Sequence, residues 1–273
     1  MTKKIAFFGN ERLATGITTK GLAKQALLDN GYDVSVIGKD SKNIEKELRL
    51  IKPDIGVLVA YGLIIPKEII NIPDFGIINI HPSLLPEGRG PSPIEEVILS
   101  GSKQTGVSIM SLVEKMDEGP VLVQQKVKLA GNEHKQELAD SLLDLGSQLL
   151  IKCLSDIFSG NANPVPQSKT DVTYTHKIQK SDGIIDWKKT AAEVEREIRA
   201  YAGWPRSRAK INNVDCIVID ADITDNESKP GHLKVDKNHL SVGCATGSLS
   251  IKKLQPAGKR PMSANEFIRG YIK

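Results

Sequence analysis

The residues best suited to chemistry lie in one stretch, GIINIHPSLLPEGRGPSPI, which runs from Gly76 to Ile94. Asn79 and His81 stand two residues apart at the end of its apolar run. In an extended strand, side chains at positions i and i+2 project to the same face, so the amide and the imidazole point the same way. An amide can donate to a developing oxyanion, and an imidazole can move a proton near neutral pH. The pair predicts a site where charge develops on oxygen while a proton is transferred.

A carboxylate to orient the imidazole has a candidate further along the chain. Asp117 lies in EKMDEGPVLVQQ, in a turn between two predicted strands, and we expect that turn at the same sheet end as His81. A neighbouring carboxylate favours the charged form of an imidazole. Taken singly, the three residues also fit structural roles: a strand-end cap, a core histidine and a turn aspartate. Their combination is what points to catalysis.

The first half of the chain predicts the elements that position these residues. Short apolar runs alternate with helical patterns, which is typical of parallel strands covered on both faces. An open, doubly wound, mainly parallel α/β sheet of the Rossmann-like kind is the economical arrangement, and ligands bind such sheets at the carboxyl ends of the strands. Strands are predicted over 4–9, 33–38, 54–62, 76–81, 105–113 and 121–129, and helices over about 18–30, 43–51, 91–101 and 135–158.

The composition changes after this α/β pattern. Asn, Pro, Ser and Thr dominate residues 159–174, which predicts a linker. A helix over 190–201, several strands of about eight residues and a final helix from Ser263 follow, which is typical of a small OB-like β-barrel. The predicted organisation is a catalytic domain over 1–163, a linker over 164–180 and a C-terminal domain over 181–273.

Composition narrows the class of protein. The 273 residues are 40% hydrophobic and 26% charged, as in ordinary soluble proteins. No apolar run approaches the roughly 20 residues needed to span a bilayer, and the N-terminus has no signal-peptide pattern. Three widely spaced cysteines argue against a disulfide framework and a zinc site. We expect a cytoplasmic protein without membrane or metal, and a monomer.

Charge is unevenly distributed between the two parts. Residues 1–176 carry 19 Lys and Arg against 21 Asp and Glu, whereas residues 177–273 carry 18 against 12. An excess of positive charge in one part favours an anionic partner bound there. A solvated surface without a partner is the alternative that charge alone leaves open.

Several motifs together resemble a known family. NIHPSLLP followed by GVSIMSLVEKMDEGPVL is similar to the folate-dependent formyltransferases, and the later segments YTHKIQKSDGIIDW, IRAYAGWPRS and LQPAGKRPMSANEF are similar to the methionyl-tRNA branch of that family. The resemblance implies transfer of a formyl group from 10-formyltetrahydrofolate to the methionyl amino group of initiator Met-tRNA. It implies catalytic roles for Asn79, His81 and Asp117, with Asn79 donating to the oxyanion, His81 moving protons and Asp117 orienting the ring.

The resemblance also implies binding residues, and it implies no metal. Two loops match the segments that bind the reduced folate. The basic residues of the C-terminal domain would contact tRNA phosphates. The folate residues are Ser83, Leu84, Leu85 and Pro86 with Tyr61, Gly62, Leu63, Ile64 and Ile65, and the tRNA residues are Arg206, Arg208, Lys210, Lys252, Lys253, Lys259 and Arg260.

The chain departs from the family pattern in three places, and rival functions remain. The basic insertion after the second strand is missing, the loop FFGNERLATG differs from the usual turn, and Gly88 replaces an aromatic residue before Arg89. A sugar-nucleotide N-formyltransferase, a nucleotide-binding oxidoreductase and a catalytically silent RNA-binding protein are the alternatives. The oxidoreductase is disfavoured because the chain has no GxGxxG fingerprint.

Overall fold

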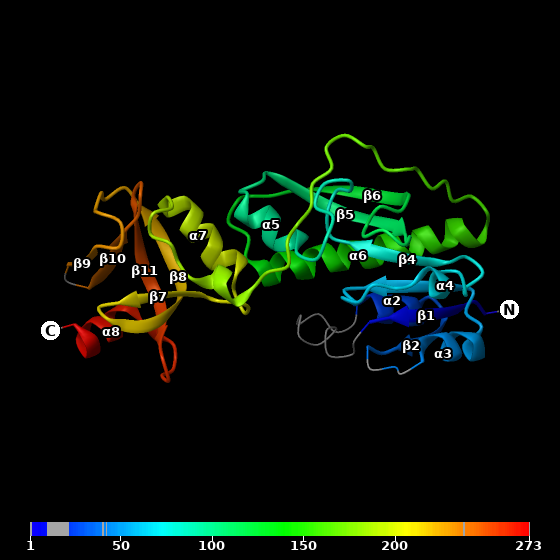
Figure 1. Cartoon of the computed structure of the whole chain (residues 1–273), viewed down its shortest axis with the longest axis horizontal. Helices are drawn as coiled ribbons and strands as arrows, with labels where there is room; N and C mark the ends of the chain where they lie inside the picture. The colour runs from blue at the N-terminus through cyan, green and yellow to red at the C-terminus, as the bar shows by residue number, and fades with distance from the viewer. Residues whose placement is uncertain (1, 10–21, 40, 42, 237, 273) are drawn as a thin grey trace. The chain divides into compact units, whose positions relative to one another are not determined.

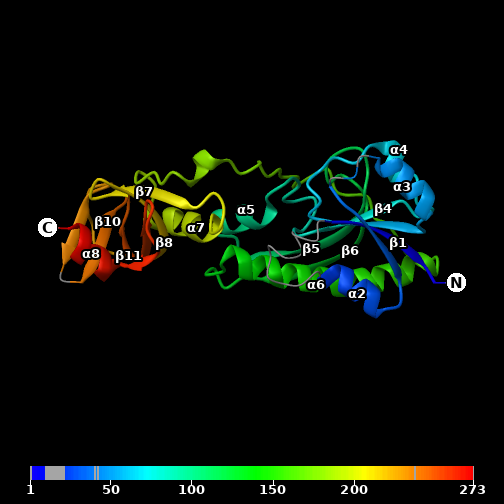
Figure 2. The same ribbon diagram turned by 90° about the horizontal axis from the view of Figure 1, so that it is seen from below.

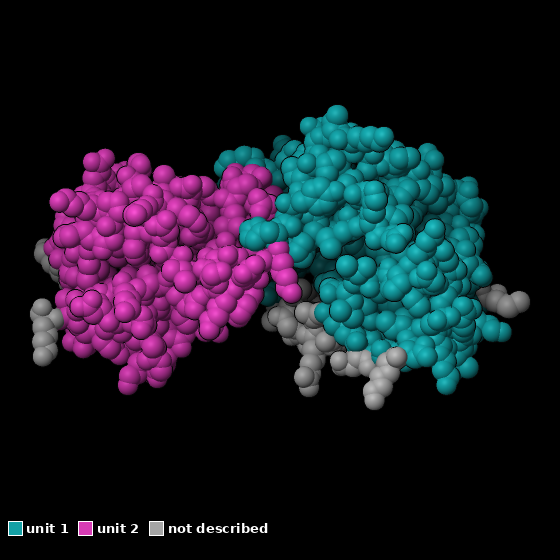
Figure 3. All heavy atoms as spheres, viewed as in Figure 1, with its two compact units in different colours: residues 1–94, 103–130, 136–176 teal, residues 95–102, 131–135, 177–273 magenta. Residues whose placement is uncertain are grey.

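The structure is a computed structural model that describes residues 2–9, 22–39, 41, 43–236 and 238–272 (Figure 1). The chain forms two compact units, coloured separately in Figure 3. Unit 1 comprises residues 1–94, 103–130 and 136–176, and unit 2 comprises residues 95–102, 131–135 and 177–273. Part of the predicted linker, up to residue 176, thus packs with unit 1. No helix in the part of the chain that the structure describes is long and apolar enough to cross a membrane.

Unit 1 is built on a six-stranded mixed sheet in the order β2-β1-β3-β4-β5-β6. The first four strands are mutually parallel, while β5 is antiparallel to β4 and β6 is antiparallel to β5. Every residue of β4 is buried, as its apolar run predicts for a central strand. The strands are β1 (Lys4–Phe8), β2 (Asp33–Ile37), β3 (Ile55–Val59), β4 (Ile77–His81), β5 (Gln104–Ser111) and β6 (Val121–Lys128).

Helices cover both faces of this sheet, which confirms the doubly wound prediction. Figure 2 shows α2 and α6 on one face, and α3 and α4 on the other. Asn43 caps α3 by accepting a hydrogen bond from the Lys46 amide. The long helix α6 packs closely, because a Cβ at its Gly146 would lie 2.5 Å from Ile80 of β4. These helices are α2 (Leu22–Asp29), α3 (Ile44–Ile51), α4 (Lys67–Ile70) and α6 (Lys135–Phe158), whereas most of α5 (Pro93–Leu99) belongs to unit 2.

Unit 2 contains an antiparallel sheet in the order β7-β8-β11-β10-β9, with β12 paired to β11. Its apolar core includes Val194, Leu249 and Phe267. Capping boxes begin α7 at Thr190 and α8 at Ser263. Its elements are a 3₁₀ turn η1 (Lys180–Gly183), α7 (Ala191–Ala200), β7 (Ser207–Ile211), β8 (Val214–Thr224), β9 (Leu233–Asp236), β10 (His239–Gly243), β11 (Ser248–Pro256), β12 (Met262–Ser263) and α8 (Ala264–Tyr271).

The structure refines the predicted fold at several points. The antiparallel direction of β5 and β6 and the short α4 were not predicted. The C-terminal domain is an antiparallel sheet, as predicted, and its edge strands β7 and β9 do not pair with each other in the described residues, which is compatible with the partly open barrel of an OB-like fold. Residues 10–21, which include much of the FFGNERLATG loop and the start of the predicted helix over 18–30, lie outside the described residues.

Candidate active site

The two residues singled out by their spacing end the central strand β4. In the sheet register Asn79 lies opposite Leu58 of β3 and Met110 of β5, and His81 lies opposite Ser108. Asn79 is 7% exposed and His81 is 4% exposed. Neighbouring strands of a central sheet position thus fix both side chains and exclude most water from them.

The Asn79 amide is a buried polar group that no described residue binds through a hydrogen bond. Its two N–H donors can bind an oxygen of a ligand, and its position beside His81 makes that ligand a reacting one. This amide is the strongest single sign that the strand end is a binding site.

The His81 ring is held by the loop that follows β4. Its Nε2 lies 2.9 Å from the Gly88 carbonyl oxygen. A carbonyl only accepts, so Nε2 carries the proton and Nδ1 of the neutral ring is the basic nitrogen. Nδ1 lies 3.9 Å from Oδ2 of Asp117, which is too far for a hydrogen bond and close enough for an ion pair once the ring is protonated.

Asp117 reaches His81 by a different route from the one expected. The β5–β6 connection leaves the sheet at the end where β4 begins, as the hydrogen bond from the Leu112 amide to the Ile77 carbonyl shows at 2.7 Å. The turn therefore starts from the other end of β4 than expected, because β5 runs antiparallel, but its Asp117 lies beside His81 as the prediction requires. Asp117 nevertheless accepts from the Gly90 amide at 2.8 Å. The turn and the loop after β4 thus meet at the carboxylate.

Glycine is required at two points of the loop after β4. Gly88 has φ +71°, and Gly90 has φ +107°, a conformation that other residues rarely adopt. A Cβ on Gly90 would lie 2.8 Å from the carbonyl oxygen of Thr175. Gly88, which departs from the aromatic residue of the family pattern, therefore permits the backbone turn that brings its carbonyl to His81.

Side chains of β5 and β6 hold the SLLP segment, residues 83–86, through hydrogen bonds to its backbone. Ser108 is fully buried, and its hydroxyl donates to the Ser83 carbonyl at 2.6 Å and accepts from the Leu85 amide at 3.2 Å. Gln124 of β6 donates to the Leu85 carbonyl at 2.9 Å and to the Ser108 hydroxyl at 2.8 Å. The side chains of Ser83 and Leu85 are buried and those of Leu84 and Pro86 are half-buried. The last two are the side chains of this segment that a ligand could reach.

The other predicted folate segment lies at the same sheet edge. It follows β3, whose last residue, Val59, pairs with Ile80 of β4. Tyr61 and Ile65 belong to the hydrophobic core, and the Tyr61 hydroxyl donates to the Gly38 carbonyl at 3.1 Å. Between them, Gly62, Leu63 and Ile64 are exposed, with Leu63 at 49% and Ile64 at 76%. Tyr61 and Ile65 therefore support the loop, while the residues between them form an apolar surface with accessible backbone.

Sequence reasoning missed the contribution of residues 164–176. Thr173 accepts from the Gly88 amide at 2.7 Å, and Thr175 accepts from the Ser92 amide at 3.0 Å. The Thr175 amide donates to the Arg89 carbonyl at 2.7 Å. The run VTYT, with β-branched residues in an otherwise polar segment, is the signal that could have revealed an extended strand-like element.

The cysteines are not candidate nucleophiles. All three are buried free thiols. Burial raises the pKa of Cys153 to about 12, and it raises the pKa of Cys216 and Cys244 to about 11. Because the thiolate is the reactive species, thiol chemistry is suppressed at all three positions.

The basic residues predicted to contact tRNA form two groups on the sheet of unit 2. Arg208 and Lys210 lie on β7, while Lys252 and Lys253 lie on β11, and β8 runs between these strands. Lys252 pairs with Asp222 of β8 at 2.9 Å. Two other basic residues also lie near carboxylates: Arg260 is 4.0 Å from Glu266, and Lys210 is opposite Asp215 in the strand register. Two arginines bind backbone carbonyls instead: Arg208 donates to Lys180, and Arg206 donates to Gly203 at 3.3 Å. Lys253 and Lys259 are exposed.

Comparison with known sequences identifies related proteins over most of the chain. Residues 6–154 match the family model described as formyl transferase, and residues 177–272 match the model described as formyl transferase, C-terminal domain. Methionyl-tRNA formyltransferase from Lachnospira eligens is 39% identical over 233 residues, covering 82% of this chain and 74% of its own. The methionyl-tRNA formyltransferase of Methylococcus capsulatus is 34% identical over 254 residues, covering 91% and 82%.

Solved structures share the fold at lower identity. HypX from Aquifex aeolicus in complex with tetrahydrofolic acid has a TM-score of 0.76 at 17% identity, over 99% of this chain and 47% of its own. An N-formyltransferase from Helicobacter canadensis, in complex with folinic acid and dTDP-3-aminofucose, gives 0.68 at 18% identity, over 92% and 99%. Methionyl-tRNA formyltransferase from Clostridium thermocellum gives 0.62 at 20% identity, over 83% and 95%.

Proposed function

The chain belongs to the methionyl-tRNA formyltransferase family, and from this premise we propose that it transfers a formyl group from 10-formyltetrahydrofolate to the free amino group of the methionyl moiety of initiator Met-tRNA. The bond between the formyl carbon and the folate nitrogen breaks, and a new amide bond forms to the methionyl nitrogen. The amine loses a proton, and the folate nitrogen gains one.

The residues present fit a reduced folate. Such a ligand is flat, with an apolar face and a polar edge that needs hydrogen bonds. The exposed side chains of Leu63 and Ile64 provide the apolar surface, and their backbone groups provide donors and acceptors. The half-buried residues Leu84 and Pro86 lie in the loop that follows His81, at the carboxyl end of β4. When bound, the folate supplies the activated formyl group.

Asn79, His81 and Asp117 then have different roles in formyl transfer. Asn79 donates to the formyl oxygen as negative charge develops there, in a site from which water is largely excluded. Nδ1 of His81 takes the proton from the attacking amine, because Nε2 already donates to Gly88. Asp117 stabilises the resulting imidazolium from 3.9 Å, and the Gly90 amide holds its carboxylate in place.

The observation that carries this proposal is the largely buried Asn79 amide, two residues before a histidine of defined tautomer on the same strand, in a chain of this family. The test is to mix the protein with 10-formyltetrahydrofolate and to offer one of two acceptors, charged Met-tRNA or an amino-sugar nucleotide, with a reaction that contains no amine as the control. We expect formyl-methionyl-tRNA alone as the product. Formylation of the amino sugar instead would identify a sugar-nucleotide N-formyltransferase, and binding of Met-tRNA without any formylation would identify a silent RNA-binding protein.

A further inference from the structure

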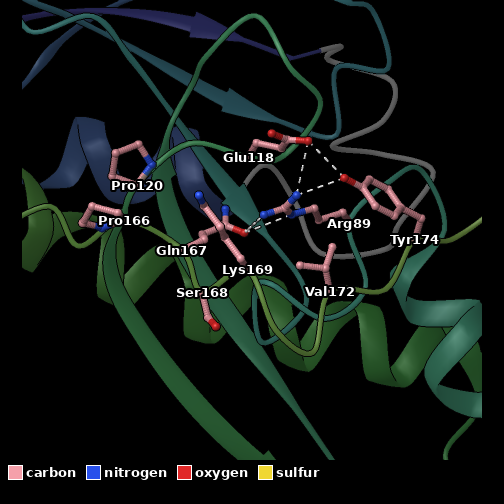
Figure 4. A pocket seen from close by; sticks show the side chains of 9 residues that line it. All are labelled: Arg89, Glu118, Pro120, Pro166, Gln167, Ser168, Lys169, Val172 and Tyr174. Atoms are coloured by element: carbon pink, nitrogen blue, oxygen red, sulfur yellow. Dashed lines mark hydrogen bonds and ion pairs between the residues drawn. The ribbon is translucent and has the colours of Figure 1, made fainter.

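Gln167, on the segment that was expected to be a linker, joins two loops of the site through its side-chain amide. Its Nε2 donates to the carbonyl oxygens of Asp117 and Gly119, at 2.7 and 2.8 Å. Its Oε1 accepts from Nε and Nη2 of Arg89, at 3.0 and 2.8 Å. One amide therefore ties the turn that bears Asp117 to the loop that follows β4. Figure 4 shows its contact with Arg89.

The orientation of this amide is fixed by its neighbours. The Arg89 side chain is buried, and its Nη1 donates to the Tyr174 hydroxyl at 3.0 Å and lies 3.3 Å from Glu118. Because a guanidinium only donates, Gln167 must direct its oxygen to Arg89 and its NH₂ group to the two carbonyls. These side chains also line a pocket of about 370 Å³ in unit 1, visible in Figure 4.

The turn needs external support because of its conformation. Asp117 has φ +53°, in the left-handed region that a residue with a Cβ occupies at a cost. The two carbonyls that Gln167 binds lie at Asp117 itself and two residues later, so they fix the backbone that aims the carboxylate. Rotation of this turn would separate the carboxylate from Gly90 and His81.

We propose that Gln167 is a positioning residue for formyl transfer, which acts by holding Asp117 against His81. This inference rests on the proposed function for its role in catalysis. Gln167 acts through Asp117 and does not contact the reacting atoms. The segment 164–176 is accordingly part of the active site, in addition to connecting it to the following residues.

Two substitutions in the full-length protein separate positioning from simple packing. Gln167→Glu preserves the shape and still accepts from Arg89, but it places an acceptor opposite two carbonyl oxygens and should push the turn away. Gln167→Ala only removes the support. Since a misplacement near 1 Å can cost about 10²-fold, we expect kcat to fall about 100-fold in Gln167→Glu and about 10-fold in Gln167→Ala. If Gln167 only packs, the isosteric Glu will be the milder change.

A control and a double mutant define the mechanism further. Ser168→Ala removes a hydroxyl on the same segment that bonds, among the described residues, only to Thr170, so kcat should stay within about twofold of wild type. In an Asp117→Asn background, Gln167→Ala should reduce kcat by less than about twofold, because its effect passes through the missing charge. If the loss of kcat in the double mutant equals the product of the losses in the two single mutants, the proposal is overturned.

A readout without activity keeps this inference separate from the proposed function. The Gly90 amide donates to the Asp117 carboxylate, so its proton resonance in a TROSY spectrum of the ligand-free protein reports where that carboxylate lies. We expect it to move upfield in both Gln167 variants and to stay unchanged in Ser168→Ala. If wild type fails to formylate Met-tRNA, the proposed function is wrong. The Gly90 resonance still tests whether Gln167 positions Asp117, because it is measured without substrate. An unchanged Gly90 resonance in both variants would overturn the positioning role.

Discussion

Replacing Asn79 should separate stability from activity. Asn79→Leu keeps the shape of the side chain and removes a buried amide that no described residue binds. Because the substitution breaks no hydrogen bond between described residues, the free energy of unfolding should stay within about 1 kcal/mol of the wild-type value. A change of that size corresponds to a shift in Tm of at most about 4 °C for a domain of this size. Loss of an oxyanion donor should lower kcat about 10²- to 10³-fold.

A matched control on the neighbouring strand sharpens this test. Ser108 is also a buried polar residue near the site, but its hydroxyl is fully bonded to Ser83, Leu85 and Gln124. Ser108→Ala leaves those groups without this hydrogen-bond partner and should lower the free energy of unfolding by at least about 2 kcal/mol. Thermal unfolding and steady-state formylation of Met-tRNA measure both variants, with Asn79→Ala as a companion that should keep its fold and lose about 10²-fold in rate. Lower stability in Asn79→Leu together with near-normal turnover would refute the reasoning.

Three further perturbations test other parts of the account. Asp117→Asn removes the charge that lies 3.9 Å from Nδ1 of His81 and would stabilise the imidazolium, so the steady-state rate of formylation should fall; an unchanged rate would make Asp117 a turn residue only. Gly90→Ala places a Cβ 2.8 Å from the Thr175 carbonyl oxygen and should displace the loop after β4. Thermal unfolding should show an intact fold, and kcat should fall about 10²-fold. Full activity would show that the loop does not require glycine at this position. Reversing Lys252, Lys253 and Lys259 to Glu should weaken tRNA binding and reduce the slope of log affinity against log salt concentration by about one for each phosphate that is no longer neutralised. Lys252 should contribute less because it already pairs with Asp222, and folate binding should stay unchanged. Superimposable salt curves would place the tRNA elsewhere.

The sequence predicted what local patterns encode. Side chains at positions i and i+2 lie on the same face of any strand, so the sequence alone predicted that Asn79 and His81 share a face. The apolar periodicity of α6 also gave its bounds, Lys135–Phe158, as the structure has them. The direction of β5 did not follow, because a strand buried on both faces has the same apolar pattern whether it runs parallel or antiparallel. The four residues of α4 are too few for a period to be visible.

The rest of the site depends on contacts between distant parts of the chain. Gln167 binds the carbonyl of a residue 50 positions earlier, and Thr173 binds the amide of a residue 85 positions earlier. No local pattern predicts such pairs, and the polar composition of residues 159–174 indicated a linker. The basic residues of unit 2 show the same limit, since only the strand order reveals that β8 and its acidic side chains separate them.

The most direct test of the account is the single-turnover rate of formyl-methionyl-tRNA formation, with saturating 10-formyltetrahydrofolate, by wild type and His81→Ala. His81 supplies the basic nitrogen of the site, so its loss should lower the rate by about 10²-fold or more while thermal unfolding shows an intact fold. Product formation by wild type with this loss in the variant is the predicted result. Near-normal formylation by His81→Ala, or no formylation by wild type, would contradict the assignment of this strand end as the catalytic site.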